Sequence, residues 1–293
     1  VIFVQMSGMG DGGPWSKYVT YAPTIHALAG LTHMTGVEGR EDIGIGFSYN
    51  DHQAGLHGAV AILAALEARN RTGQGQHVDI SQFEVGVNFA GPALLDAFAN
   101  KRFARPCGNK LPFDDAAPHG CYRCAPVDAS SIEEERWIAI ACMNDDQWQA
   151  LVELMGRPVW AQDPALQTAS GRVAAAPMLD LRVSEWTADQ DAYDLMARAQ
   201  AVGVPAGVVQ TGEDMASRDP CIKVSNFLRK TEDSSPSLGE TWIDALPIQF
   251  GATPCNTYRR VRDIGEDSEA VLTDWLKMSA EAIDQVKQQG VLK

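Results

Sequence analysis

The chain has 293 residues, of which 45% are hydrophobic and 21% charged, as in an ordinary globular protein. Its formal net charge is -14, from 38 acidic and 24 basic side chains, so no nucleic-acid partner is expected, because neutralising phosphates requires a basic surface. No apolar run approaches the roughly 20 residues that span a bilayer, so no membrane partner is expected either.

The first predicted elements lead up to a long helix. Residues 1–6 alternate apolar and polar side chains, which predicts a strand, and a glycine-rich turn follows at residues 8–14. Residues 18–35 carry apolar side chains at helical spacing, with an interruption near Pro23. Because the chain begins without Met, inside this first strand, we expect a fragment or a split gene whose N-terminal part is absent.

The longest predicted helix covers residues 48–69. It opens with polar residues and a carboxylate, Asp51, and then contains Ala, Gly, Leu, Ile and Val with no charge before Glu67. A helix that is apolar on almost every side is expected to be buried. Asp51 lies at or near its N-cap, where the helix dipole and free N–H groups stabilise an anion. Asp51 is therefore either a cap or a permanently ionised nucleophile, and the residues alone favour the cap.

After this helix the chain passes through a linker into a second region. Residues 77–81 alternate as a strand does, and residues 101–120 are rich in Pro, Gly and Asp, which is typical of a linker. Strands of one predicted sheet lie at residues 121–124, 137–142 and 242–250, and another strand lies at 203–209. Further helices are predicted at residues 83–100, 145–155, 177–187, 189–202 and 269–290.

Two other groups of reactive side chains give weaker signals. Cys121 and Cys124 have the spacing of half a zinc site, but no second pair completes the four ligands that a structural site needs. His52 and His57 flank Asp51, yet positions five apart do not share a helix face well, so packing or hydrogen bonding is favoured and no metal is expected. Six scattered cysteines are no disulfide framework, and free thiols fit a cytoplasmic protein.

Motifs spread over nearly the whole chain form a set. Residues 8–14, with Tyr21, Gly30-Leu31 and Gly36 after them, match a GxGxxGP…Y…SGL…TG segment. Residues 51–57 and 64–76 match the signature D-x-x-x-G…A-L-x-x-R-x-x-T-G-x-G-Q, and shorter matches lie at residues 203–209 and 265–267. This set resembles the class III CoA-transferase family, also called CaiB/BaiF, which includes formyl-CoA and carnitine CoA-transferases.

The resemblance implies an enzyme and assigns roles to three residues. Asp51 falls on the family's nucleophilic aspartate, and Tyr21 and Gln82 are implied to bind the CoA substrate. The implied reaction moves CoA from an acyl-CoA donor to a carboxylic acid acceptor through a covalent aspartyl intermediate. No cofactor is bound permanently, because the CoA thioester is itself the substrate.

The resemblance also implies an architecture. The fold expected is α/β, with a Rossmann-like large domain, incomplete here, and a smaller α+β domain. Residues 1–110 would belong to the large domain, residues 111–253 to the linker and small domain, and residues 254–293 would return to the large domain. Family members form interlocked dimers, so a homodimer or heterodimer is expected, and the family's N-terminal third is absent from this chain.

Two alternatives remain open. Acyl-CoA racemases share the fold, but the position of their histidine is Tyr21 in this chain, which removes a general base and favours transfer over proton abstraction. The other alternative is a non-catalytic partner subunit or fragment.

Overall fold

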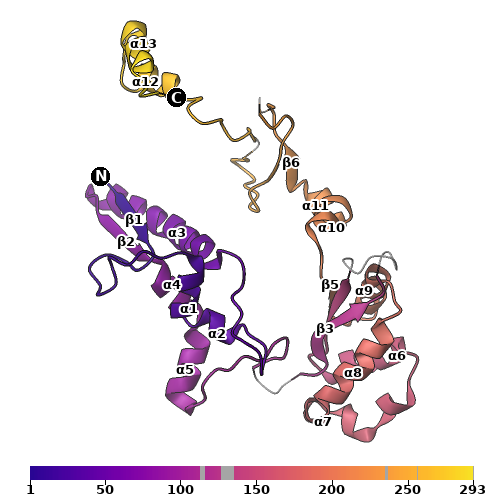
Figure 1. The fold of residues 1–293 in the computed structure, drawn as a ribbon. Helices are drawn as coiled ribbons and strands as arrows, with labels where there is room; N and C mark the ends of the chain where they lie inside the picture. Colours follow the sequence, from indigo (N-terminus) through magenta and orange to yellow (C-terminus); the bar gives the residue numbers. More distant parts are fainter. Residues whose placement is uncertain (113–115, 127–134, 235–236, 256, 293) are drawn as a thin grey trace. The chain divides into compact units, whose positions relative to one another are not determined.

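The computed structural model describes residues 1–112, 116–126, 135–234, 237–255 and 257–292 (Figure 1). Helices and strands are mixed, with parallel and antiparallel sheets, so the α/β character expected from the sequence is confirmed at this level. The chain divides into two units, Val1–Val209 and Gln210–Lys293. The domain boundaries at residues 110 and 253 stay predictions. No helix within the described ranges has the length and hydropathy needed to cross a bilayer.

The N-terminal elements form a strand–helix–strand arrangement. Strand β1 (Phe3–Ser7) pairs in parallel with β2 (His77–Ser81), and the helix α3 (Tyr49–Thr72) lies between them in the chain. An added Cβ at Gly58 of α3 would meet Ile80 and Met6 at 3.7 and 3.8 Å, so the helix packs closely on this pair of strands. Parallel strands require such a crossover connection, which explains why the longest helix stands here.

Shorter helices flank this arrangement, and each break in them has a local cause. The helix expected at residues 18–35, with an interruption near Pro23, is two helices, α1 (Ala22–Leu28) and α2 (Leu31–Met34). Pro23 lies in the first turn of α1, and the break lies at Gly30, whose φ is 81°. The helix expected at residues 83–100 is also divided, into α4 (Gln82–Phe89) and α5 (Gly91–Asn100). Pro92 lies in the first turn of α5, where the missing N–H costs no helical bond.

The expected burial of α3 is wrong for this chain. Its buried residues are Asn50, Ala54, Gly58 and Ala65, which follow one narrow stripe of polar and small side chains. Three large apolar side chains at helical spacing are exposed instead, with 61% of Leu56, 67% of Val60 and 66% of Leu63 accessible. The physical reason is that neighbouring elements cover one side of the helix only. An apolar pattern indicates which side chains favour burial, and it does not say what covers them.

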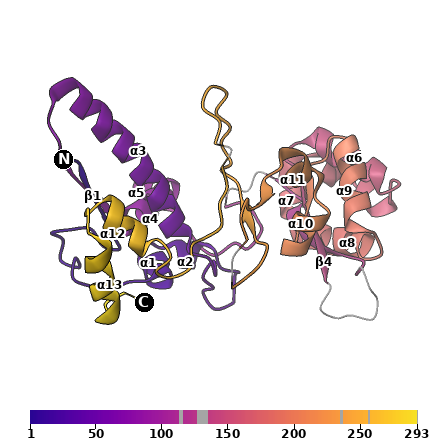
Figure 2. The ribbon, with the colours of Figure 1, turned by 90° about the horizontal axis from the view of Figure 1, so that it is seen from above.

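A second group of elements surrounds an antiparallel sheet. Its strands are β3 (His119–Cys124), β4 (Arg136–Ala141) and β5 (Ala206–Val208), in the order β3-β4-β5 among the described residues. The neighbouring helices are α6 (Asp145–Leu154), α7 (Ala169–Ala174), α8 (Ala176–Thr187) and α9 (Ala192–Ala201), with short 3-10 turns at Val159–Gln162 and Pro164–Gln167 (Figure 2). Trp148, Leu179 and Leu195 are fully buried between helices and sheet.

The third strand of this sheet corrects the expectation from the sequence. Residues 206–208 provide it, whereas Trp242–Asp244 forms β7, which pairs with β6 (Leu228–Lys230) in a separate antiparallel sheet of the second unit. Strand β7 ends before Pro247, which has no N–H to donate to a ladder. The second unit also contains α10 (Gly212–Ser217), α11 (Pro220–Ser225), α12 (Ser268–Asp274) and α13 (Ala280–Gln288).

Candidate active site

Asp51 lies in the first turn of α3 and its side chain is exposed. The N-cap of the helix is Ser48, so Asp51 is near the cap, as expected, without being the cap itself. The first N–H groups of a helix have no intrahelical partner, and together with the helix dipole they favour a negative charge at this end. The location therefore leaves the Asp51 carboxylate accessible to another molecule.

Gln82 is brought to Asp51 by the fold. It is the first residue of α4, directly after strand β2, and its Nε2 donates a long hydrogen bond of 3.4 Å to Oδ1 of Asp51. The two residues are 31 positions apart in the chain. An exposed carboxylate and an amide donor thus lie together at the point where two helices begin.

A buried polar group holds these two helix ends together. Asn50 is fully buried; its backbone N–H donates to Nε2 of His26 at 3.2 Å and its Nδ2 donates to the Gln82 carbonyl at 3.4 Å. An added Cβ at Gly86 would come within 2.4 Å of the Asn50 amide, so only glycine fits there. The bond to Nε2 places the His26 proton on Nδ1. Sequence reasoning missed His26 and Gly86, because neither stands near Asn50 in the chain.

Tyr21 does not join this pair within the described contacts. It is the N-cap residue of α1, its side chain is 76% exposed, and its backbone bonds to Thr24 through both N–H and carbonyl. In the part of the chain that the structure describes, no hydrogen bond links Tyr21 to Asp51 or Gln82. Its accessible aromatic ring remains a candidate contact for a bound molecule.

The other reactive side chains singled out in the sequence are two histidines with hydrogen-bond partners on α3 and two cysteines on β3. His52 and His57 each place Nδ1 2.8 Å from the backbone carbonyl four residues earlier on α3, which fits the hydrogen-bonding role favoured for them. Cys121 and Cys124 stand three apart on β3, so their side chains leave opposite faces of the strand. Burial raises the pKa of the Cys124 thiol to about 11 and also raises the pKa of Cys121, which disfavours the thiolate that zinc requires.

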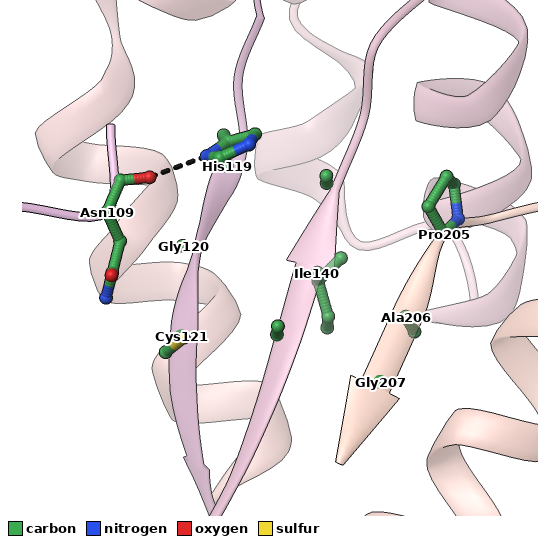
Figure 3. A pocket seen from close by; sticks show the side chains of 10 residues that line it. Asn109, His119, Gly120, Cys121, Ile140, Pro205, Ala206 and Gly207 are labelled. Carbon is green, nitrogen blue, oxygen red and sulfur yellow. Dashed lines mark hydrogen bonds between the residues drawn. The ribbon is translucent and has the colours of Figure 1, made fainter. Parts of the chain in front are cut away.

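The sheet β3-β4-β5 carries a separate hollow of about 380 Å³ (Figure 3). Its floor is made of small residues that leave the strands uncovered, among them Gly120, Ala139 and Gly207. His119 stands at its edge and donates from Nδ1 to the Asn109 carbonyl at 2.5 Å. The sequence predicted strands at these positions, but it carried no signal for the uncovered face of the sheet.

An accessible carboxylate at a helix N-terminus, beside an amide donor in a mixed α/β chain, is an arrangement suited to covalent acyl chemistry. The chain matches the profile of CoA-transferase family III over residues 1–268. It therefore belongs to this family, as the motifs had indicated.

Relatives agree with this assignment. The chain is 30% identical to a probable CoA-transferase, Rv1866, of Mycobacterium tuberculosis, covering 100% of this chain and 36% of that protein. It is 28% identical to a succinyl-CoA–D-citramalate CoA-transferase of Chloroflexus aurantiacus, covering 100% and 69%. The crystal structure of a CAIB/BAIF family protein from Brucella suis matches with a TM-score of 0.80 at 27% identity, over 94% of this chain and 68% of that one. The chain thus spans about a third to two thirds of the length of these proteins.

Proposed function

We propose that this chain takes part in transferring CoA from an acyl-CoA thioester to a carboxylic acid, with Asp51 as the nucleophile. The observation that carries the proposal is the exposed Asp51 carboxylate in the first turn of α3, with the Gln82 amide 3.4 Å away. Family membership supports the reaction class, and the Chloroflexus relative is named for a reaction of this kind.

The proposed reaction begins with attack on the donor. An oxygen of the Asp51 carboxylate attacks the thioester carbonyl carbon, the C–S bond breaks, and CoA leaves as its thiolate while a mixed anhydride forms. The thiolate then attacks the Asp51 carbonyl carbon, which releases the donor's carboxylate and leaves an aspartyl-CoA thioester. No proton needs to be moved in these steps, so a general base is not required.

The second half repeats these steps in reverse. The acceptor carboxylate attacks the aspartyl thioester and expels CoA thiolate, which attacks the acceptor carbonyl of the new anhydride and frees the Asp51 carboxylate. Each attack develops negative charge on a carbonyl oxygen. The N–H groups at the start of α3 and the Gln82 amide are the donors that we assign to that charge.

Further parts of the proposal concern binding and assembly. We assign Tyr21 and Gln82 to binding the CoA substrate, supported by the 76% exposure of Tyr21 and by the position of Gln82 beside Asp51. We also propose a Rossmann-like large domain, in keeping with the parallel β1–β2 pair crossed over by α3, and a dimer that covers the exposed face of α3. The racemase alternative finds no support at Tyr21, which offers no imidazole.

The covalent intermediate provides the test. The 293-residue chain is incubated with succinyl-CoA, treated with hydroxylamine and digested for mass spectrometry. We expect a hydroxamate on Asp51 in the unaltered chain and in the Glu67→Gln control, which changes another exposed carboxylate of α3, and none in Asp51→Asn. An Asp51→Asn chain that still exchanges acyl groups would refute the role of Asp51. A chain that binds CoA but forms no adduct would favour the non-catalytic subunit.

A further inference from the structure

The second unit contains a hollow that the proposed CoA transfer does not use. Its volume is about 750 Å³, and it lies between α11, β6 and the segment after β7. Small-molecule sites typically measure roughly 300–1,000 Å³. Every lining residue falls between Cys221 and Tyr258, so the hollow belongs entirely to this unit.

Among the described residues that line the hollow, Arg229 is the one that carries a charge. No Asp or Glu belongs to the described lining residues, although the chain as a whole has 38 acidic side chains and a net charge of -14. A cation with no acidic side chain among the described lining residues favours an anion from outside. The molecule that fits this hollow therefore has a negatively charged group.

Arg229 is held in place without being neutralised. Its Nε donates to the Asn226 carbonyl at 3.1 Å, and its Cζ lies 4.4 Å from the centroid of the Tyr258 ring. The described residues offer it no ion pair. Stacking orients the planar guanidinium, and its terminal N–H groups have the paired geometry that suits a carboxylate.

The remaining walls are largely apolar. Leu246, Ile248 and Phe250 line the hollow with 43%, 54% and 49% of their surfaces exposed, and Phe227 contributes another ring. Covering such surface with an apolar group is favourable, because it removes that surface from water. A ligand with a hydrocarbon body would cover these side chains while its head reached Arg229.

We propose that this hollow binds an aliphatic monocarboxylate, with the carboxylate on Arg229 and the alkyl chain against Phe227, Leu246 and Ile248. The inference does not rest on the proposed function, because none of these residues takes part in the chemistry assigned to Asp51. Ser225 and Gln249 also line the hollow and add neutral hydrogen-bonding groups to it.

Two cysteines provide a built-in reporter of occupancy. Of the six cysteines, Cys221 and Cys255 are the two that are exposed, and both line this hollow. Iodoacetamide is neutral and alkylates accessible thiols, and peptide mass spectrometry measures the rate at each one. In the 293-residue chain we expect octanoate to slow alkylation of Cys221 and Cys255 and to leave Cys107 unchanged. Octanol and inorganic phosphate, which each lack one half of the ligand, should protect weakly.

Substitutions test the contributions of Arg229 and of the apolar walls separately. Arg229→Gln should weaken octanoate binding, measured by calorimetry, by at least about tenfold, since it removes a hydrogen-bonded charge. Lys223→Gln removes a positive charge from α11 outside the lining and should bind as the unaltered chain does. If Arg229→Gln fails to fold, Ile248→Glu supplies the test, because its side chain is half exposed and the new carboxylate should abolish octanoate binding.

The outcomes decide between the proposal and its rivals. Equal protection by octanol would show an apolar hollow with no role for Arg229, and equal protection by phosphate would show a site for inorganic anions. Either result overturns the proposal, as does unchanged alkylation in the presence of octanoate. Loss of protection in Arg229→Gln or Ile248→Glu, with Lys223→Gln unaffected, supports it.

Discussion

Residues 1–100 and residues 117–208 bury their large side chains to different extents. In the second region Trp148 and Leu195 are fully buried between helices and sheet. In the first region the longest helix, α3, buries Ala54 and Ala65 completely or nearly so, while 66% of Leu63 on the same helix stays exposed. The second region thus has an extensive core of large side chains, whereas the first buries few, such as Ile25, and leaves those of α3 at its surface.

This difference separates the source of stability from the location of the candidate chemistry. Burying a large aliphatic or aromatic side chain stabilises a fold by about 1.5–3 kcal/mol, whereas a buried alanine contributes far less. Asp51 and Gln82 belong to the region with the smaller contribution. The residues assigned to catalysis therefore lie in the region whose apolar side chains most need cover from additional protein surface. The region around β3, β4 and β5 needs such cover least.

A pair of leucine truncations tests this comparison and has the largest expected effect. Leu195→Ala removes a fully buried side chain and should lower the free energy of unfolding by about 2–5 kcal/mol. Leu63→Ala makes the same chemical change at an exposed position of α3 and should change it by less than about 0.5 kcal/mol. Urea unfolding of the 293-residue chain, followed by tryptophan fluorescence, measures both. Equal losses would mean that α3 is covered in solution.

A charge on the exposed face of α3 tests whether a second copy covers it. Leu56, Val60 and Leu63 form one apolar stripe, and a patch of this kind favours association. Leu63→Glu should therefore weaken self-association of the chain by about tenfold, the equivalent of roughly 1.4 kcal/mol. Asn70→Glu adds the same charge at an exposed polar position of α3 and should have no effect. Analytical ultracentrifugation over a concentration series gives the association constants, and an unaltered chain that stays monomeric throughout would contradict the dimer.

The sequence predicted much of the fold through local signals. The run of apolar residues closed by a glycine turn located α3, and alternation located β2. Strands β3 and β4 were also expected, as two strands of one sheet. The pairing of β3 with β4 was expected and is confirmed, whereas the third strand of this sheet was wrongly expected at residues 242–250, because a strand pattern does not specify the register or the neighbour of the strand. Burial of α3 was wrong for a related reason, since cover comes from parts of the molecule that a local pattern does not describe.

The candidate site was predictable in part. The carboxylate of Asp51 at the start of a helix followed from residue pattern, whereas the pairing with Gln82 across 31 positions required the family resemblance and then the structure. The support from His26 and Gly86 was invisible in the sequence, because a histidine and a glycine distant in the chain carry no sign of a shared asparagine. Long-range polar contacts of this kind depend on the packing of whole helices.

The second unit is stabilised in part by hydrogen bonds and ion pairs to Glu266, which acid should weaken slightly. Bonds from Arg260, Arg262 and the Asp263 backbone hold the pKa of Glu266 at about 2, below its ordinary 4.5. A lowered pKa means that the contribution of Glu266 to the free energy of unfolding is complete above about pH 4.5 and is lost as the pH falls toward 2.

Glu266→Gln should therefore flatten the pH dependence of unfolding in that window, while Glu38→Gln, which changes an exposed glutamate, should leave it unchanged. Urea unfolding at pH 3 and pH 6 measures this pH dependence. The effect should be smaller than those of the leucine truncations and of Leu63→Glu, because partly exposed ion pairs contribute little to stability. An unchanged pH dependence in Glu266→Gln would place the acid sensitivity elsewhere and leave the core around Leu195 as the main stabilising feature.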